Sequence, residues 1–81
     1  MSTVIRHHVV EKLEFDADDM RITIDGRDLR FPLAAISKRL LAATLEQRRQ
    51  FEVSASGYGI HWPLVDEDLS IDGLLKVADE R

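Results

Sequence analysis

Residues 20–31 read MRITIDGRDLRF, and this stretch decides the class of fold. From Met20 to Ile24 every second residue is apolar, which is the pattern of a strand with one buried face. Asp25-Gly26 follows, and this dipeptide strongly favours the tight turn of a β-hairpin. Beyond the turn, apolar residues again stand at alternate positions up to Phe31. The stretch therefore predicts two antiparallel strands joined by a tight turn.

A third strand is predicted immediately before this hairpin. Within residues 9–15, Val9, Leu13 and Phe15 fall on one side of an extended chain, and we expect all three to face the core. The polar residues 16–19 then form a turn. The three strands together predict an antiparallel β-meander.

After Pro32 the spacing of apolar residues changes to that of a helix. Leu33–Ala43 is predicted as one short helix. Thr44 is followed three positions later by Gln47, which is a capping box and predicts a second helical segment over residues 45–50.

The rest of the chain predicts a further strand or hairpin and a closing helix. Residues 51–55 and 60–62 alternate with period two, and residues 56–59 form a turn between them. The last helix is amphipathic, and Asp68 or Ser70 is its expected N-cap. The acidic run from Asp66 would then lie at the N-terminus of this helix, where carboxylates are favoured. Gly73 inside the helix costs about 1 kcal/mol relative to Ala, which predicts a close packing contact there.

These elements predict an α+β fold, an antiparallel β-meander with two or three short helices packed on it, in a single small domain over residues 1–81. The chain has no Cys, which excludes disulfides and Cys-ligated zinc. No apolar run approaches the roughly 20 residues of a membrane span, and residues 1–8 lack the apolar stretch of a secretory signal. We therefore expect a cytoplasmic protein. The net charge of −4 suits a basic protein partner better than nucleic acid.

Residues 57–63 read GYGIHWP and gather rare residue types, among them the only Trp and the only Tyr of the chain. Gly57 and Gly59, like Gly26, are predicted turn residues that permit positive φ or close backbone approach. Aromatic side chains that are partly exposed often anchor binding partners. The candidate binding residues are Tyr58, His61, Trp62, Asp66 and Asp68.

The sequence contains no recognisable set of catalytic side chains. His61 has the chemistry of a general base, but no nucleophile and orienting group accompany it. The adjacent His7 and His8 would point to opposite faces of a strand and would not readily hold one ion. The acidic residues 16–19 lack the Gly and Glu of a calcium loop. We expect no catalytic residue, no metal and no cofactor.

Several motifs occur along the chain in a characteristic order. They are Asp25-Gly26, Pro32-Leu33, Leu40-Leu41, Ala43-Thr44, Glu46-Gln47-Arg48, GYGIHWP at 57–63, DEDLSI at 66–71 and Leu74-Leu75. On these residues, over roughly 9–75, the chain resembles domain-of-unknown-function family 2442, which consists of short bacterial proteins. The resemblance implies an α+β fold, a bacterial origin and no established catalytic residues. Some members carry a helix-turn-helix DNA-binding domain, and others lie beside a second small protein in what resembles a toxin–antitoxin pair.

We expect a non-catalytic bacterial protein-interaction domain, the antitoxin-like or regulatory member of a two-gene module. Its partner would be the product of an adjacent gene. The partner would dock on a sheet edge or on the surface of Tyr58, His61 and Trp62. A homodimer is also compatible with the sequence. One alternative is a small-molecule or minor enzymatic site at His61 and Trp62. Another is a nucleic-acid accessory role for the basic residues of the middle helices, which otherwise form a hydrated helix face. These basic residues are Lys38, Arg39, Arg48 and Arg49.

Overall fold

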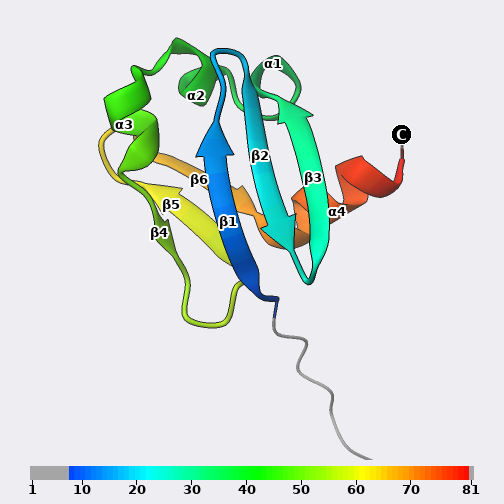
Figure 1. The fold of residues 1–81 in the computed structure, drawn as a ribbon. Helices are drawn as coiled ribbons and strands as arrows, with labels where there is room; N and C mark the ends of the chain where they lie inside the picture. Colours follow the sequence, from blue (N-terminus) through cyan, green and yellow to red (C-terminus); the bar gives the residue numbers. More distant parts are fainter. Residues whose placement is uncertain (1–7, 81) are drawn as a thin grey trace, which may run out of the picture.

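Two three-stranded antiparallel sheets enclose the core of the computed structural model, which describes residues 8–80 (Figure 1). The first sheet consists of β1 (Val10–Phe15), β2 (Asp19–Ile24) and β3 (Arg27–Pro32). The second consists of β4 (Glu52–Val53), β5 (Gly59–Trp62) and β6 (Glu67–Ser70). Three short helices connect the sheets, namely α1 (Leu33–Ile36), α2 (Lys38–Ala42) and α3 (Leu45–Arg49), and α4 (Ile71–Asp79) closes the described chain. The predicted α+β fold and its meander are confirmed. His7, considered above, lies outside the described residues.

The predicted hairpin forms between β2 and β3. Asp25 has φ of 51° and Gly26 has φ of 79°, the left-handed conformations that a tight two-residue hairpin turn requires. Ile24 pairs with Arg27 across the turn. The alternate residues of β2 face inward, and Ile22 and Ile24 are at most 2% exposed.

The alternation predicted for β1 is wrong at its start. Val9 is 57% exposed, whereas Val10 pairs with Ile24 and packs against the core. A bulge between Val10 and Lys12 causes the difference, because the extra residue shifts the alternation of side chains by one. Leu13, beyond the bulge, packs against the core as predicted.

The single helix predicted over residues 33–43 is also wrong, because Ser37 breaks it. Ser37 is extended, with φ of −162° and ψ of 107°, and it ends α1 and begins α2. Its Oγ accepts a hydrogen bond from the N–H of Leu40 and donates one to Glu67. Side-chain capping by Ser competes with helix continuation, and here it divides the helix.

The capping box predicted for α3 is present. Thr44 Oγ1 accepts from the N–H of Gln47 at 3.1 Å, and Gln47 Oε1 accepts from the N–H of Thr44 at 2.9 Å. The last helix begins at Ile71, with Ser70 as its N-cap.

The second sheet has a strand, β6, that the sequence did not predict. Glu67 and Asp68 lie in β6, which leads directly into α4, so the acidic run precedes the last helix as expected but is part of a strand. The close packing contact predicted at Gly73 is absent within the described residues, because a Cβ there would meet only the Ser70 side chain at 3.5 Å.

The core lies between the sheets and is centred on Trp62, which is fully buried. Phe15 meets the Trp62 ring edge-on at 6.4 Å between centroids, and Phe51 packs beside it at 6.3 Å. Trp62 Nε1 donates to the backbone carbonyl of Arg48 at 2.9 Å. The indole thus fills the core and also holds α3.

Arg48 is buried in this core, with 5% of its surface exposed. Its guanidinium lies 5.9 Å from the centre of the Phe15 ring. It donates to four backbone carbonyls, two at the end of α2 and two in the turn between β1 and β2. The acceptors are Leu40 and Leu41, then Asp16 and Ala17. One side chain therefore joins three segments of backbone.

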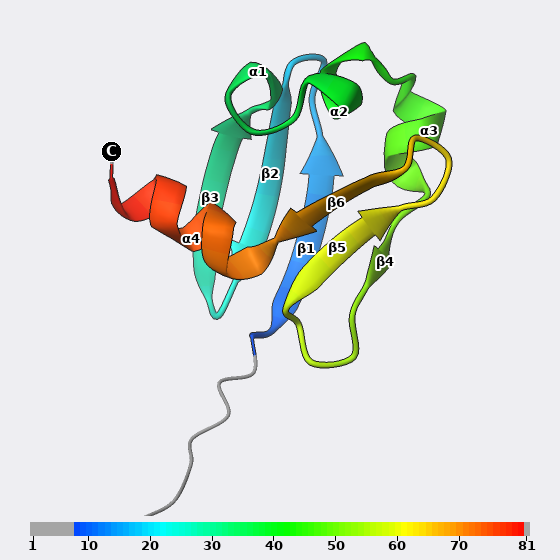
Figure 2. The same cartoon turned by 180° about the vertical axis from the view of Figure 1, so that it is seen from behind.

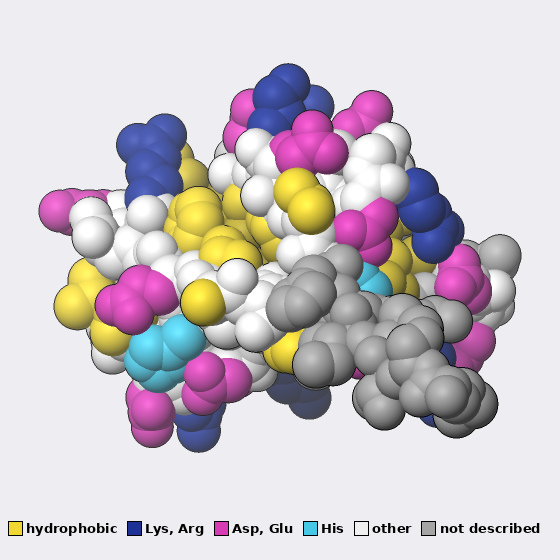
Figure 3. Space-filling view, turned by 90° about the horizontal axis from the view of Figure 1, so that it is seen from below, with side chains coloured by type: hydrophobic (Ala, Val, Ile, Leu, Met, Phe, Trp, Pro, Cys, Tyr) yellow, Lys and Arg dark blue, Asp and Glu magenta, His cyan; other side chains and the backbone are white. Residues whose placement is uncertain are grey.

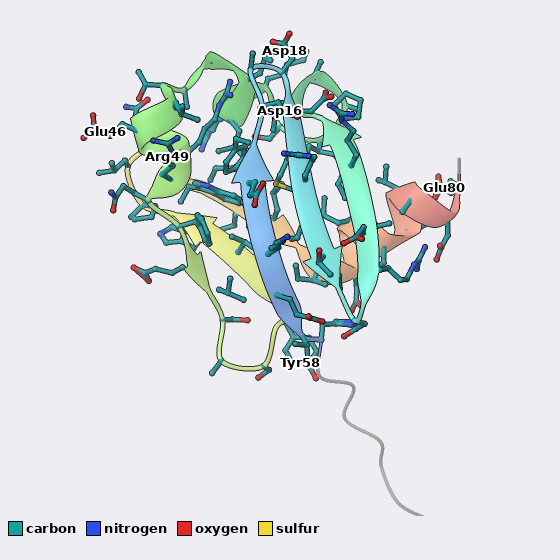
Figure 4. All side chains as sticks on the ribbon, in the orientation of Figure 1. Asp16, Asp18, Glu46, Arg49, Tyr58 and Glu80 are labelled. Atoms are coloured by element: carbon teal, nitrogen blue, oxygen red, sulfur yellow. The ribbon has the colours of Figure 1, made fainter. Side chains whose placement is uncertain are left out.

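Replacing Arg48 with Met should lower the free energy of unfolding by about 3 kcal/mol or more, because buried carbonyls lose their donors. Urea unfolding followed by Trp62 fluorescence measures the change. Arg49→Met on the same helix is the matched control, since Arg49 is exposed (Figure 4), and it should change stability by no more than about 0.5 kcal/mol. Equal effects of the two substitutions would contradict the role assigned to Arg48.

Candidate interaction face

The five candidate binding residues do not form one surface, but His61 and Asp68 are hydrogen-bonded to each other. His61 Nδ1 lies 2.8 Å from Asp68 Oδ1. The two residues are directly opposite each other on β5 and β6. Their side chains are 41% and 74% exposed, respectively.

A third ionisable residue completes a row across the second sheet. Glu52 on β4 pairs in register with His61, on the side away from Asp68. Because Ile60 and Trp62 face the core, the intervening His61 points to the opposite, outer face. We call the outer face formed by Glu52, His61 and Asp68 the acidic face.

The acidic face is open and slightly hollow. Figure 2 looks onto β5 and β6, and none of the described helices crosses in front of them. A shallow depression runs over the sheet, lined by Glu52, Val53, Ser54, Gly59, Ile60, His61, Asp68 and Leu69. Gly59 contributes no side chain there. Seen from below, the surface has a histidine with acidic side chains beside it (Figure 3).

The segment that builds this sheet has no positive side chain of the Lys or Arg type. Residues 50–75 contain five carboxylates and neither Lys nor Arg. The acidic face therefore has no Lys or Arg on its own strands. The lack of Lys and Arg can be seen in the sequence. Only the strand register shows that Glu52 and His61 are neighbours.

The remaining candidates lie elsewhere. Trp62 is buried, so the expectation that it contacts a partner is wrong for this structure. Asp66 is in the turn after β5 with φ of 52°, and its carbonyl accepts a hydrogen bond from Arg39. Tyr58 is 42% exposed in the loop between β4 and β5, at the lower end of the molecule (Figure 4).

Of the three predicted turn glycines, two have the expected turn conformation and one does not. Gly26 and Gly57 both have positive φ, as expected for turn residues. Gly59 instead begins β5, and the prediction that it forms a turn is wrong. Ser54 organises the loop before it, because Ser54 Oγ accepts from the N–H groups of Tyr58 and Gly59.

The basic residues of the middle helices also do not form one exposed surface. Arg48 is buried, so it is not part of a hydrated helix face, and Arg39 is engaged by the Asp66 carbonyl. Lys38 and Arg49 remain exposed.

Sequence reasoning missed a second histidine cluster, at the lower end of the fold. His8 Nδ1 lies 2.7 Å from Asp25 Oδ2, and His8 Nε2 lies 2.8 Å from Asp72 Oδ1. The His8 side chain is only 9% exposed. Hydrogen bonds to the Asp25 and Asp72 carboxylates raise the pKa of His8 above its usual 6.5. The same bond to His8, together with the N–H of Val9, lowers the pKa of Asp25 below 3.8.

The backbone of His8 is held as tightly as its ring. Its N–H donates to the carbonyl of Ser56 at 3.2 Å. A Cβ on Gly57 would lie 1.8 Å from the His8 carbonyl oxygen, so only glycine fits there. His8 thus joins the β2–β3 turn, the β4–β5 loop and α4.

Neither histidine cluster forms a metal site by its geometry. Within residues 8–80 no group of three or more His, Cys, Asp or Glu side chains is arranged to hold a metal ion. None of the helices in this range is long and apolar enough to span a membrane.

Fold and surface together define a small two-sheet α+β domain with one acidic, uncovered sheet face. The chain belongs to the family described as "Protein of unknown function (DUF2442)", whose model matches residues 10–80. It is similar to a protein of unknown function from Rhodospirillum rubrum known from a crystal structure, with a TM-score of 0.67 and 28% identity over 84% of each chain. No curated protein matches the sequence.

Gly57→Ala should destabilise the fold more than Gly26→Ala. Both positions have positive φ, which costs an L-residue roughly 1–2 kcal/mol, but a Cβ at Gly26 meets nothing within 4 Å. The difference between the two variants therefore isolates the collision with His8. Thermal and urea unfolding measure it, and equal losses would contradict the close approach of residue 8 to the loop.

His8→Gln should reduce stability mainly between about pH 4 and pH 6.5. The raised pKa of His8 makes its bonds stabilising below 6.5, and that contribution is lost as the pH rises through the higher folded pKa. The lowered pKa of Asp25 makes its contribution present above 3.8 and lost as the pH falls through the lower folded pKa. The measurement is the difference in unfolding free energy between wild type and variant across pH.

Asp25→Asn should remove the same pH-dependent contribution to the free energy of unfolding. It should keep the turn, because Asn also accepts the left-handed conformation. His61→Gln is the control, since the exposed His61 has one carboxylate partner where His8 has two. A pH-independent loss in His8→Gln would contradict an ionic role for His8.

Proposed function

We propose that this chain is a non-catalytic protein-interaction domain that binds a basic partner through the acidic face. The observation that carries the proposal is the row of Glu52, His61 and Asp68 on an open sheet, in a segment without Lys or Arg. Complementary charge on a partner would steer the encounter and fix its orientation.

The outer face of the first sheet supplies the contrast. Two of its cations are already paired across the strands, Arg21 with Glu14 at 3.3 Å and Arg30 with Asp19 at 2.8 Å. The acidic face has no Lys or Arg of its own on its strands, so a cation from outside would find unneutralised carboxylates.

The depression gives the acidic face a way to accept a long side chain. Gly59 carries no side chain, and the depression over it continues past His61 to Glu52 and Asp68. The stem of a partner Lys or Arg would lie in this depression while its charged end meets the carboxylates. The bond to His61 holds Asp68 in place for that contact.

The burial of Trp62 weakens the alternative of a ligand or enzymatic site at His61 and Trp62, because the indole is not accessible beside the imidazole. The burial of Arg48 likewise weakens the nucleic-acid alternative. We therefore assign no reaction to His61 and retain the role of an antitoxin-like or regulatory member of a two-gene module. On that proposal the basic partner is the product of an adjacent gene.

Co-expression with the adjacent gene product tests the proposal. We expect the two proteins to co-purify and the complex to weaken as salt rises, because screening acts on the charged contacts. Glu52→Gln combined with Asp68→Asn should weaken binding about tenfold or more by calorimetry.

Glu46→Gln combined with Glu80→Gln removes the same charge from two exposed positions far from the acidic face (Figure 4). This control should bind almost as wild type. Separate migration of the two proteins, or equal weakening in both double variants, would refute the proposal.

A further inference from the structure

We propose that two copies of the chain associate through the free edge of β1, which joins their three-stranded first sheets into one continuous sheet. This contact uses the first sheet and is independent of the function proposed for the acidic face. The strand register leaves backbone N–H and C=O groups at this edge without a partner strand, and these groups carry the inference.

The register fixes the direction of every backbone group in β1. The N–H of Asp16 donates to the carbonyl of Asp19 at 2.9 Å, just beyond the last strand pair. Alternation along an antiparallel ladder then bonds Glu14 to Arg21 and directs the N–H and C=O of Leu13 and Phe15 away from β2. Beyond the sheet, no other described backbone group bonds to Leu13.

The opposite edge of this sheet, at β3, is protected. The N–H of Leu33 donates to the carbonyl of Asp18, which places Arg30 and Pro32 with their backbone groups outward. Pro32 has no N–H to offer, and Pro is one of the usual means of protecting an edge strand.

The second sheet offers no comparable edge within the described residues. At the β6 edge the N–H of Asp68 is already taken by Glu67 Oε1 at 2.9 Å. At the other edge, β4 is only two residues long. The β1 edge is therefore the longest one left unblocked.

Open space lies directly beside β1. A hollow is lined by Leu13, Glu14, Phe15, Arg49 and Phe51. Backbone groups that point into such a hollow can be reached by an added strand, and strand addition at sheet edges is a recurrent mode of recognition.

The sequence of β1 is complementary to itself in one register. In an antiparallel pair centred on Leu13, the two Leu13 residues exchange hydrogen bonds and Lys12 of each copy faces Glu14 of the other. Opposite charges that face each other across strands stabilise the pair. The neighbouring register with the same hydrogen-bond direction is centred on Glu14 and sets two carboxylates against each other.

Glu11, Lys12 and Glu14 are all exposed in the single chain, so the contact needs no rearrangement of the core. Because the open edge is short, association should depend on protein concentration.

Sedimentation velocity over a concentration series tests the proposal on the full chain. We expect a monomer–dimer equilibrium in the wild type and a dissociation constant about tenfold or more higher in both Lys12→Glu and Glu14→Lys, because each variant opposes like charges. An equimolar mixture of the two variants should recover dimers, since each supplies the charge that the other lacks. Lys38→Glu, at an exposed position of α2, is the control and should behave as wild type.

Amide exchange places the contact. The N–H of Leu13 should become protected as concentration rises, and circular dichroism verifies that each variant is folded. A wild type that is monomeric at every concentration would overturn the proposal. Dimers unaffected by both charge reversals, or a mixture that fails to recover them, would overturn it equally.

Discussion

The buried guanidinium of Arg48 is the interaction on which the arrangement of helices and sheets depends. Burying a charged side chain is costly unless its donors are satisfied. The Arg48 donors are satisfied by carbonyls at the end of α2 and in the β1–β2 turn. A helix as short as α2 leaves its last carbonyls without intrahelical partners. The Leu40 carbonyl also accepts from the N–H of Ala43, whereas Arg48 supplies the donor for the Leu41 carbonyl. The Trp62 indole then bonds to the Arg48 carbonyl, and the second sheet is thereby tied to the same point.

A second junction, at His8, holds the opposite end of the fold. The ring bonds to Asp25 and Asp72, while the backbone passes so close to Gly57 that no side chain fits between them. Both junctions use polar groups to connect segments distant in sequence, since a chain of 81 residues has a limited apolar core. The two differ in one respect. A guanidinium is charged at any ordinary pH, whereas the His8 junction changes with pH.

Local signals predicted the elements that local interactions form. The Asp25-Gly26 turn and the Thr44 capping box each depend on residues next to one another in sequence, and both were predicted correctly. The bulge that turns Val9 outward and the strand β6 depend on pairing with distant residues, and β6 has only Leu69 as an apolar residue. The grouping of the candidate site residues could not be predicted for the same reason. His61 and Asp68 are seven positions apart and meet only through the register, while His8 and Asp72 are separated by 64.

The two outer faces of the molecule differ in a way that the amino-acid order explains. In the first sheet some opposite charges meet across the strands, as between Glu14 and Arg21, although Arg21 also faces Arg30. The strands of the second sheet come from a segment without Lys or Arg, so strand pairing there brings carboxylates together with no Lys or Arg between them. Folding therefore neutralises more of the charge on the first face than on the acidic face. A face of the second kind lowers its own repulsion when a cation arrives, which gives binding a driving force that the fold alone does not provide.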